Sequence, residues 1–347
     1  MVNTGTRDEL NDENGIAHFI EHVIFKGTRK RNTYQVLSYL ENVGGDLNAY
    51  TTKEETFFYA SVLNTYLGRA VELLSDIMFH SSFHKKDIDT EKDVVIEEIK
   101  SYKDNPSELI FDEFENLIFD GHPLGTNILG TKASVKSFTK QKIEQFMQRT
   151  YHTDQIVIAI VGNVPFTKCI TLAEKYVGII PENRRNYQRL SFNYFTVRHE
   201  IKKQHGMQSH ALIGQALPHF NEKKNQTAIL LNNILGGPGL NTRLNLAVRE
   251  KNGYVYTVES SYAALSDVGL FSVYAASDAK NLDKTLELIY KEMHKLCTQK
   301  LGSLQLHRAH LQLIGQTCIT NESNLTEMLS IGKNHLLYNE VESIPSL

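Results

Sequence analysis

Three polar residues interrupt an apolar stretch near the start of the chain: His18, Glu21 and His22. The stretch Gly15–Lys26 has the periodicity of a helix, with Asn14 as its expected N-terminal cap. Offsets of three and four residues place the three polar side chains on one helix face, about one turn apart. Two imidazoles on adjacent turns can bind one metal ion, and a neighbouring Glu can accept a proton from water. The spacing therefore predicts a metal-dependent hydrolytic site.

The alternative interpretation is a solvated helix face that carries His and Glu by chance. Against it, the neighbouring residues are apolar, and they indicate a helix that is buried on most sides: Ile16, Phe19, Ile20, Val23 and Ile24. Buried polar groups without partners are costly, and metal coordination removes that cost. The order His-x-x-Glu-His is also that of the inverted zinc-peptidase motif. Together these observations favour the metal site.

A catalytic zinc site needs a third protein ligand and one open position. The best candidate is Glu98, on a predicted helix that spans Asp87–Lys103. Glu91 lies two turns earlier on the same face and is expected to support the site, whereas Glu97 points about 100° away. The alternative is that these carboxylates only form a charged outer face of the helix.

Three segments resemble the pitrilysin and insulin-degrading zinc peptidases, and most closely the short bacterial members similar to mitochondrial processing peptidase. These segments are GIAHFIEHVIFKGT, GGDLNAYTTKEETFFYAS and EKDVVIEEIKSYKDNP. The resemblance implies one Zn²⁺ ion per chain, bound by His18, His22 and Glu98. It implies that Glu21 is the general base and that Glu91 assists it. It also implies that Asn48 and Ala49 lie on an edge strand that holds the peptide substrate.

A further segment of this resemblance, LGGPGLNTRLNLAVREKNGYVYTVESSY, lies in the second half of the chain. It implies that Arg249 and Tyr256 face the metal from the opposite half of a clamshell and bind the substrate carbonyl. Both side chains can donate hydrogen bonds to a developing oxyanion. Without the resemblance, Arg249 is better explained as a charge at a helix end. Because this chain corresponds to one half of such a clamshell, we expect a homodimer or a pair with a related chain.

The composition is that of a globular protein, with 347 residues, 41% hydrophobic and 22% charged. A net charge of −3 gives no electrostatic reason to bind nucleic acid or an anionic membrane, and no apolar run predicts a membrane span. Three scattered cysteines suit a reducing compartment. No secretory signal is visible, so we expect a cytoplasmic protein, and the resemblance implies a bacterial one. The resemblance also suggests that a first strand and a last helix are trimmed, which leaves the periplasm and the mitochondrial matrix open.

The hydrophobic pattern predicts an α+β fold of two similar domains. Each domain would contain an antiparallel-rich mixed sheet with helices packed on one face. The resemblance implies that the two domains together form half of a peptidase clamshell. The expected boundaries are residues 1–184 for the zinc-binding domain, 185–198 for a polar linker and 199–347 for the domain with the Arg/Tyr segment. Predicted strands are 47–52, 56–63, 155–164, 211–216, 255–263 and 269–276, of which 155–164 is expected to be buried.

Two other functions stay open at this stage. The chain could be a catalytically inactive structural or peptide-binding subunit of the same fold, or it could hold a structural zinc ion. The complete set of predicted ligands disfavours the first, and the lack of a fourth ligand disfavours the second. Two further His pairs, His80 with His84 and His307 with His310, have no Glu partner and are expected at the surface.

Overall fold

The computed structural model describes residues 1–193, 196–204, 206–219 and 222–341, which form two compact units. The first unit contains residues 1–101, 126–190 and 321–341, and the second contains residues 102–125 and 191–320. Segments 102–125 and 321–341 are thus grouped differently from the predicted domains 1–184 and 199–347. The predicted linker at 185–198 stays a prediction.

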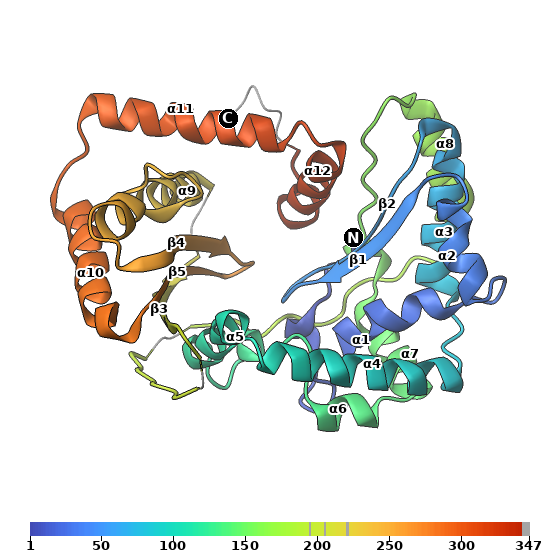
Figure 1. The fold of residues 1–347 in the computed structure, drawn as a ribbon. Coiled ribbons are helices and arrows are strands. Elements are labelled where there is room, and N and C mark those ends of the chain that lie inside the picture. Colours follow the sequence, from blue (N-terminus) through green and yellow to red (C-terminus); the bar gives the residue numbers. More distant parts are fainter. Residues whose placement is uncertain (194–195, 205, 220–221, 342–347) are drawn as a thin grey trace. The chain divides into compact units, whose positions relative to one another are not determined.

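The first unit consists of helices around a two-stranded antiparallel sheet (Figure 1). Strand β1 (Asp46–Thr51) pairs with β2 (Thr56–Ser61), with Asn48 opposite Tyr59 and Ala49 opposite Phe58. Both strands were predicted from their alternating pattern. The helices of this unit are α1 (Ile16–Val23), α2 (Thr33–Glu41), α3 (Leu67–His80), α4 (Lys85–Lys103, which ends in the second unit), α6 (Lys132–Ser137), α7 (Lys140–Thr150), α8 (Phe166–Tyr176) and α12 (Asn324–Tyr338).

Helix α1 is packed into the core of the first unit. The side chains of Ile16, Phe19 and Ile20 are fully buried, and the ring of Phe19 lies 5.2 Å from that of Phe138. Burying a side chain of this size contributes about 1.5–3 kcal/mol, so the apolar residues fix the helix in one orientation. Its polar face is thereby directed toward β1 and α4, which lie on either side of it (Figure 1).

The second unit contains a three-stranded antiparallel sheet in the order β3-β5-β4. These strands span Ser209–Pro218, Val268–Ser277 and Val255–Ala264, in agreement with the three strands predicted for this half. The central strand β5 is buried at nearly every position, as expected for a strand with neighbours on both edges. The helices are α5 (Pro106–Ile118), α9 (Glu222–Gly236), α10 (Leu282–Thr298) and α11 (Ser303–Thr320), with a π-helical segment at Asn245–Glu250.

One predicted strand is wrong. The apolar segment 155–164 is not a strand, and Ile158 is 46% exposed. Its backbone pairs only at its beginning, where Ile156 forms a bridge with Val2 and the Val157 N–H donates to the Met1 carbonyl at 3.0 Å. A strand needs a neighbour along its length, and the described residues offer one only at these positions.

The connecting segment that ends at Leu190 is bound to the first unit. Arg189 donates hydrogen bonds to both carboxylate oxygens of the buried Asp8, at 3.0 and 2.7 Å. Arg7 donates to the carbonyl of Leu190 at 2.6 Å and forms a buried ion pair with Glu54 at the same distance. The observed architecture confirms the α+β class with antiparallel sheets and packed helices. Within the described part of the chain, no helix has the length and apolarity that a membrane crossing requires.

Candidate metal centre

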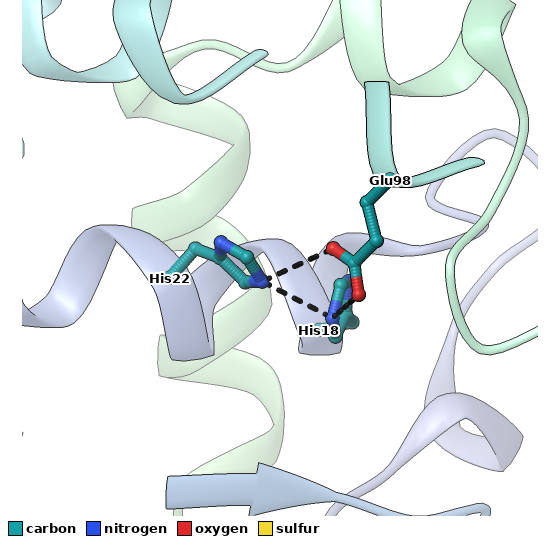
Figure 2. Close-up of side chains that lie close together, drawn as sticks. All are labelled: His18, His22 and Glu98. Carbon is teal, nitrogen blue, oxygen red and sulfur yellow. Dashed lines mark hydrogen bonds and ion pairs between the residues drawn. The ribbon is translucent and has the colours of Figure 1, made fainter. Parts of the chain in front are cut away.

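Helices α1 and α4 bring His18, His22 and Glu98 together, although α4 begins more than sixty residues after α1 ends (Figure 2). The Nε2 atoms of the two imidazoles lie 3.2 Å apart. The Glu98 carboxylate lies 3.7 Å from His18 Nε2 through Oε1 and 3.5 Å from His22 Nε2 through Oε2. One ligand atom from each residue falls within 4.8 Å of the others, and no other group of this kind occurs among the residues that the structure describes.

These distances fit a tetrahedral zinc ion. Two imidazole nitrogens at about 2.0–2.1 Å from such an ion are about 3.3 Å apart, close to the 3.2 Å between His18 and His22. Oε2 of Glu98 is a buried oxygen without a hydrogen-bond donor in the described part of the chain. Three ligands of the types His, His and Glu leave one tetrahedral position for another molecule, which is typical of catalytic rather than structural zinc sites.

The ring of His22 is oriented by Glu91. Nδ1 of His22 donates to Oε1 of Glu91 at 3.0 Å, and the other oxygen of Glu91 pairs with Lys26 Nζ at 2.6 Å. Burial opposes the charge on Glu91, but the hydrogen bonds from His22 and Lys26 prevail and lower its pKa. An ionised Glu91 can only accept, so it keeps the proton of His22 on Nδ1 and leaves Nε2 free to bind a metal.

The two imidazoles differ in their electrostatic environments. Burial lowers the pKa of His18 to about 3, with a smaller contribution from His22, so His18 is neutral at ordinary pH. For His22, burial also lowers the pKa, but the hydrogen bond to Glu91 and the charge of Glu98 outweigh it, and the pKa is raised. Neutral His18 can bind a metal ion without losing a proton. His22 is protonated over a wider pH range than an ordinary histidine, so a metal ion must displace its proton over that range.

Glu21 lies on the same helix and is bound by β1. The hydroxyl of Thr51 donates to Oε2 of Glu21 at 2.7 Å. Burial raises the pKa of Glu21, and the Thr51 hydrogen bond opposes that rise. A carboxylate with a raised pKa, held by a hydrogen bond from Thr51 beside two candidate metal-binding imidazoles, has the properties of a general base.

Asn48 and Ala49 lie in β1, whose one edge pairs with β2. No strand in the described residues pairs with the other edge. Asn48 is exposed, and its side-chain oxygen accepts the N–H of Ala49 at 2.9 Å. Strand β1, on which the resemblance places the substrate, is therefore an edge strand. Its last residue, Thr51, is the one that contacts Glu21.

Arg249 and Tyr256 lie in the second compact unit. Arg249 is exposed near the end of the π-helical segment, and Tyr256 is 58% exposed on β4. The hydroxyl of Tyr256 lies 3.4 Å from a carboxylate oxygen of Asp278. Both side chains are accessible to a ligand, and their function at the metal stays a prediction.

Several other residues occupy the places that the sequence predicts. Glu97 is exposed and pairs with Lys100 at 2.6 Å, away from the metal ligands. His84 is exposed, and the three cysteines are free.

Three contacts around the site were not predicted. Lys26 could have been found, because it follows His22 by four residues and so lies on the same helix face. Thr51 and Glu9 carry no such signal. Glu9, rather than Asn14, accepts hydrogen bonds from the first turn of α1.

Comparisons with known proteins identify the family of the chain. Residues 1–132 match the family model described as Insulinase (Peptidase family M16), and residues 137–313 match that of the Peptidase M16 inactive domain. The metal-binding candidates all lie in the first match. The uncharacterized zinc protease YmxG of Bacillus subtilis is 32% identical over 346 residues, covering 100% of this chain and 84% of the relative. An uncharacterized zinc protease of Rickettsia felis is 32% identical and covers 97% of this chain and 81% of its own.

Solved structures show the same fold. A peptidase M16 inactive domain protein from Pseudomonas fluorescens has a TM-score of 0.89 at 20% identity, covering 97% of this chain and 81% of that one. A protease from Helicobacter pylori has a TM-score of 0.86 at 21% identity, with 98% and 83% covered. On the family models and the sequence relatives together, the chain belongs to peptidase family M16, the insulinase or pitrilysin family.

Proposed function

We propose that this protein is a zinc metallopeptidase that hydrolyses peptide bonds in extended oligopeptides or unfolded polypeptides. The observation that carries the proposal is the convergence of His18, His22 and Glu98 at distances that suit one zinc ion, with Glu21 on the same helix. The names of the relatives, which are zinc proteases, support the same chemistry.

The residues of the site divide the chemistry between them. Bound zinc supplies Lewis acidity for attack on the scissile carbonyl. Glu21 accepts the proton of the attacking water and later delivers it to the leaving amine. Thr51 keeps the Glu21 carboxylate in place, and Glu91 with Lys26 keeps His22 in the tautomer that ligates.

Strand β1 is the proposed site of substrate binding. Its unpaired edge can add an extended peptide as a further strand, through backbone hydrogen bonds that do not depend on side-chain identity. Asn48 and Ala49 lie on this strand, two to three residues before Thr51. Most strands of a folded protein are already paired on both edges or covered, so the site favours unfolded polypeptides.

We further propose a homodimer, or a pair with a related chain, in which each zinc site receives Arg249 and Tyr256 from the partner. Both residues are exposed and can donate to an oxyanion. The test is a mixture of two inactive variants, Glu21→Gln and Arg249→Ala. Recovery of activity on mixing supports a site built from residues of both chains. If the two variants exchange subunits and activity does not recover, the shared site is contradicted.

The function is tested by measuring the zinc content of the purified protein and its cleavage of a quenched-fluorescence peptide library, with and without chelator. The expected result is about one zinc ion per chain and cleavage that stops on chelation and returns when zinc is added. Zinc without cleavage would instead favour the alternative, a catalytically inactive subunit that binds peptides. No zinc at all would overturn the metal site.

A further inference from the structure

The N-terminus of helix α1 has no cap from its own neighbouring side chains. The helix begins after Gly15, whose φ of 88° is left-handed and which carries no side chain. Asn14, the expected cap, donates its side-chain amide to the carbonyl of Asn127 at 3.1 Å. The first N–H groups of a helix have no partner inside the helix, so they need an acceptor from elsewhere.

Glu9 is that acceptor. Its Oε2 accepts the N–H of Gly15 at 2.9 Å, and its Oε1 accepts the N–H of Ala17 at 3.0 Å. The side-chain amide of Asn14 is a third, longer donor at 3.4 Å. Both oxygens of one carboxyl group are thus bound to the turn that leads directly into His18, and the contact spans eight residues of sequence.

Glu9 is itself held in place. It directly follows the short helical turn Thr6–Asp8, in which the N–H of Gly5 donates to Asp8 at 3.0 Å. Asp8 is in turn bound by Arg189. Because the backbone at Glu9 is anchored in this way, its carboxyl group can hold the helix turn that it contacts.

The entry to α1 also tolerates little movement. A Cβ added at Gly15 would lie 2.7 Å from the Cα of Gly130 and 2.7 Å from the carbonyl oxygen of Leu129. The first turn therefore sits against the backbone of another loop on one side and against Glu9 on the other. Because His18 lies in this first turn, a small rotation of the turn displaces its Nε2 from the position it shares with His22 and Glu98.

We propose that Glu9 is a positioning residue of the metal site: by binding the first turn of α1 it sets the direction of His18 and so raises the affinity for zinc. This rests on the proposed zinc site, but it is a statement about metal affinity and needs no catalytic activity. Supporting residues one step removed from a metal typically change affinity by 10–100-fold when they are substituted.

The experiment compares zinc affinity, measured by competition with a chromogenic chelator, for the whole protein and for Glu9→Ala, Glu9→Gln and Asn32→Ala. Asn32 is the matched control, because its side chain caps α2 in the same unit by accepting the N–H of Gln35 at 2.9 Å and lies outside the metal site. We expect Glu9→Ala to lower zinc affinity at least about 10-fold and Glu9→Gln, which keeps one acceptor oxygen, to lower it less.

Asn32→Ala should lower thermal stability with zinc affinity unchanged. Circular dichroism is used to check that each variant is folded before the zinc affinities are compared. If Glu9→Ala is not folded, the comparison of Glu9→Gln with Asn32→Ala decides. Zinc affinity equal to that of the unmodified protein in the folded Glu9 variants would overturn the inference and leave the zinc site intact. A lack of zinc binding by the unmodified protein would instead overturn the proposed function.

Discussion

The hydroxyl of Thr51 donates a hydrogen bond of 2.7 Å to Oε2 of Glu21, and this bond joins the edge strand β1 to the proposed general base. Substrate that pairs with β1 would bind to the same strand that holds the base. In the proposed function, Thr51 would thus connect substrate binding to catalysis.

Replacing Thr51 by Val removes this hydrogen bond and keeps the side-chain volume. We expect kcat to fall about 10-fold, equivalent to about 1.4 kcal/mol in the barrier, because the base loses its fixed position. KM and zinc content should stay the same. Thr51→Ser keeps the hydroxyl and is the control. Equal kcat values for the Val and Ser variants in steady-state peptide cleavage would contradict a positioning function for Thr51.

Glu21→Gln tests the base directly. The amide cannot accept a proton, so we expect kcat to fall by about 10²–10⁴-fold while the three metal ligands are unchanged. Zinc content, measured by atomic absorption, should equal that of the unmodified protein. Full activity in this variant would show that another residue is the base, whereas loss of zinc would show that Glu21 supports the metal site.

Glu91→Gln weakens the contacts to both His22 and Lys26 without changing the size of the side chain. We expect zinc affinity to fall by about 10–100-fold, because the His22 ring is no longer held by a charged acceptor. Glu97→Gln is the matched control on the same helix, since Glu97 is exposed and pairs with Lys100 instead of the residues of the site. A chelator competition titration measures both, and equal affinities for the two variants would argue against a function for Glu91.

The stability of the fold should depend on pH through Glu9. Burial raises the pKa of Glu9 to about 8 in the folded protein, against hydrogen bonds that lower it, compared with 4.5 as the ordinary value. Between these values the folded chain binds this proton more tightly than the unfolded chain does. Its contribution to stability is therefore present below about pH 4.5 and is lost as the pH rises through 8, at no more than about 1.4 kcal/mol per pH unit.

Urea unfolding of the metal-free protein at pH 5, 6.5 and 8 measures this dependence. The difference in unfolding free energy between the unmodified protein and Glu9→Gln should change in favour of the variant as the pH rises, because an amide does not titrate. A difference that is constant over this range would mean that Glu9 titrates outside it.

Short-range spacing alone predicts which polar side chains of α1 lie together. His18, Glu21 and His22 lie within two turns of one helix, so periodicity alone places them on one face. Glu98 was a candidate from its place on the predicted helix 87–103, but its approach to the two imidazoles depends on the packing of α4 against α1, a tertiary property that spacing does not encode. Thr51 and Glu9 were not predictable, since each makes its contact across a chain reversal that no local pattern encodes.

The fold was predictable where the hydrophobic pattern coincided with burial. The pattern failed at segment 155–164. This apolar, β-branched segment pairs with the N-terminal residues only at its beginning, so it does not form a strand. Helix α5 is not among the predicted elements. It begins at Pro106, where the lack of an N–H costs nothing because the first turn of a helix has no partner for it. The π-helical segment 245–250 has a period too close to that of an α-helix to be distinguished by pattern.

The interleaving of the chain between the two units has a consequence for biosynthesis. The first unit, which holds the proposed metal ligands, includes α12. There Lys333 lies 3.5 Å from the buried carboxylate of Glu55, and Gly332 lies against the side chain of Met1. A ribosome that has made the first 190 residues has therefore not yet supplied every piece of that unit. Domains generally fold as units during synthesis, so we expect the first unit to be completed only after α12 has been made.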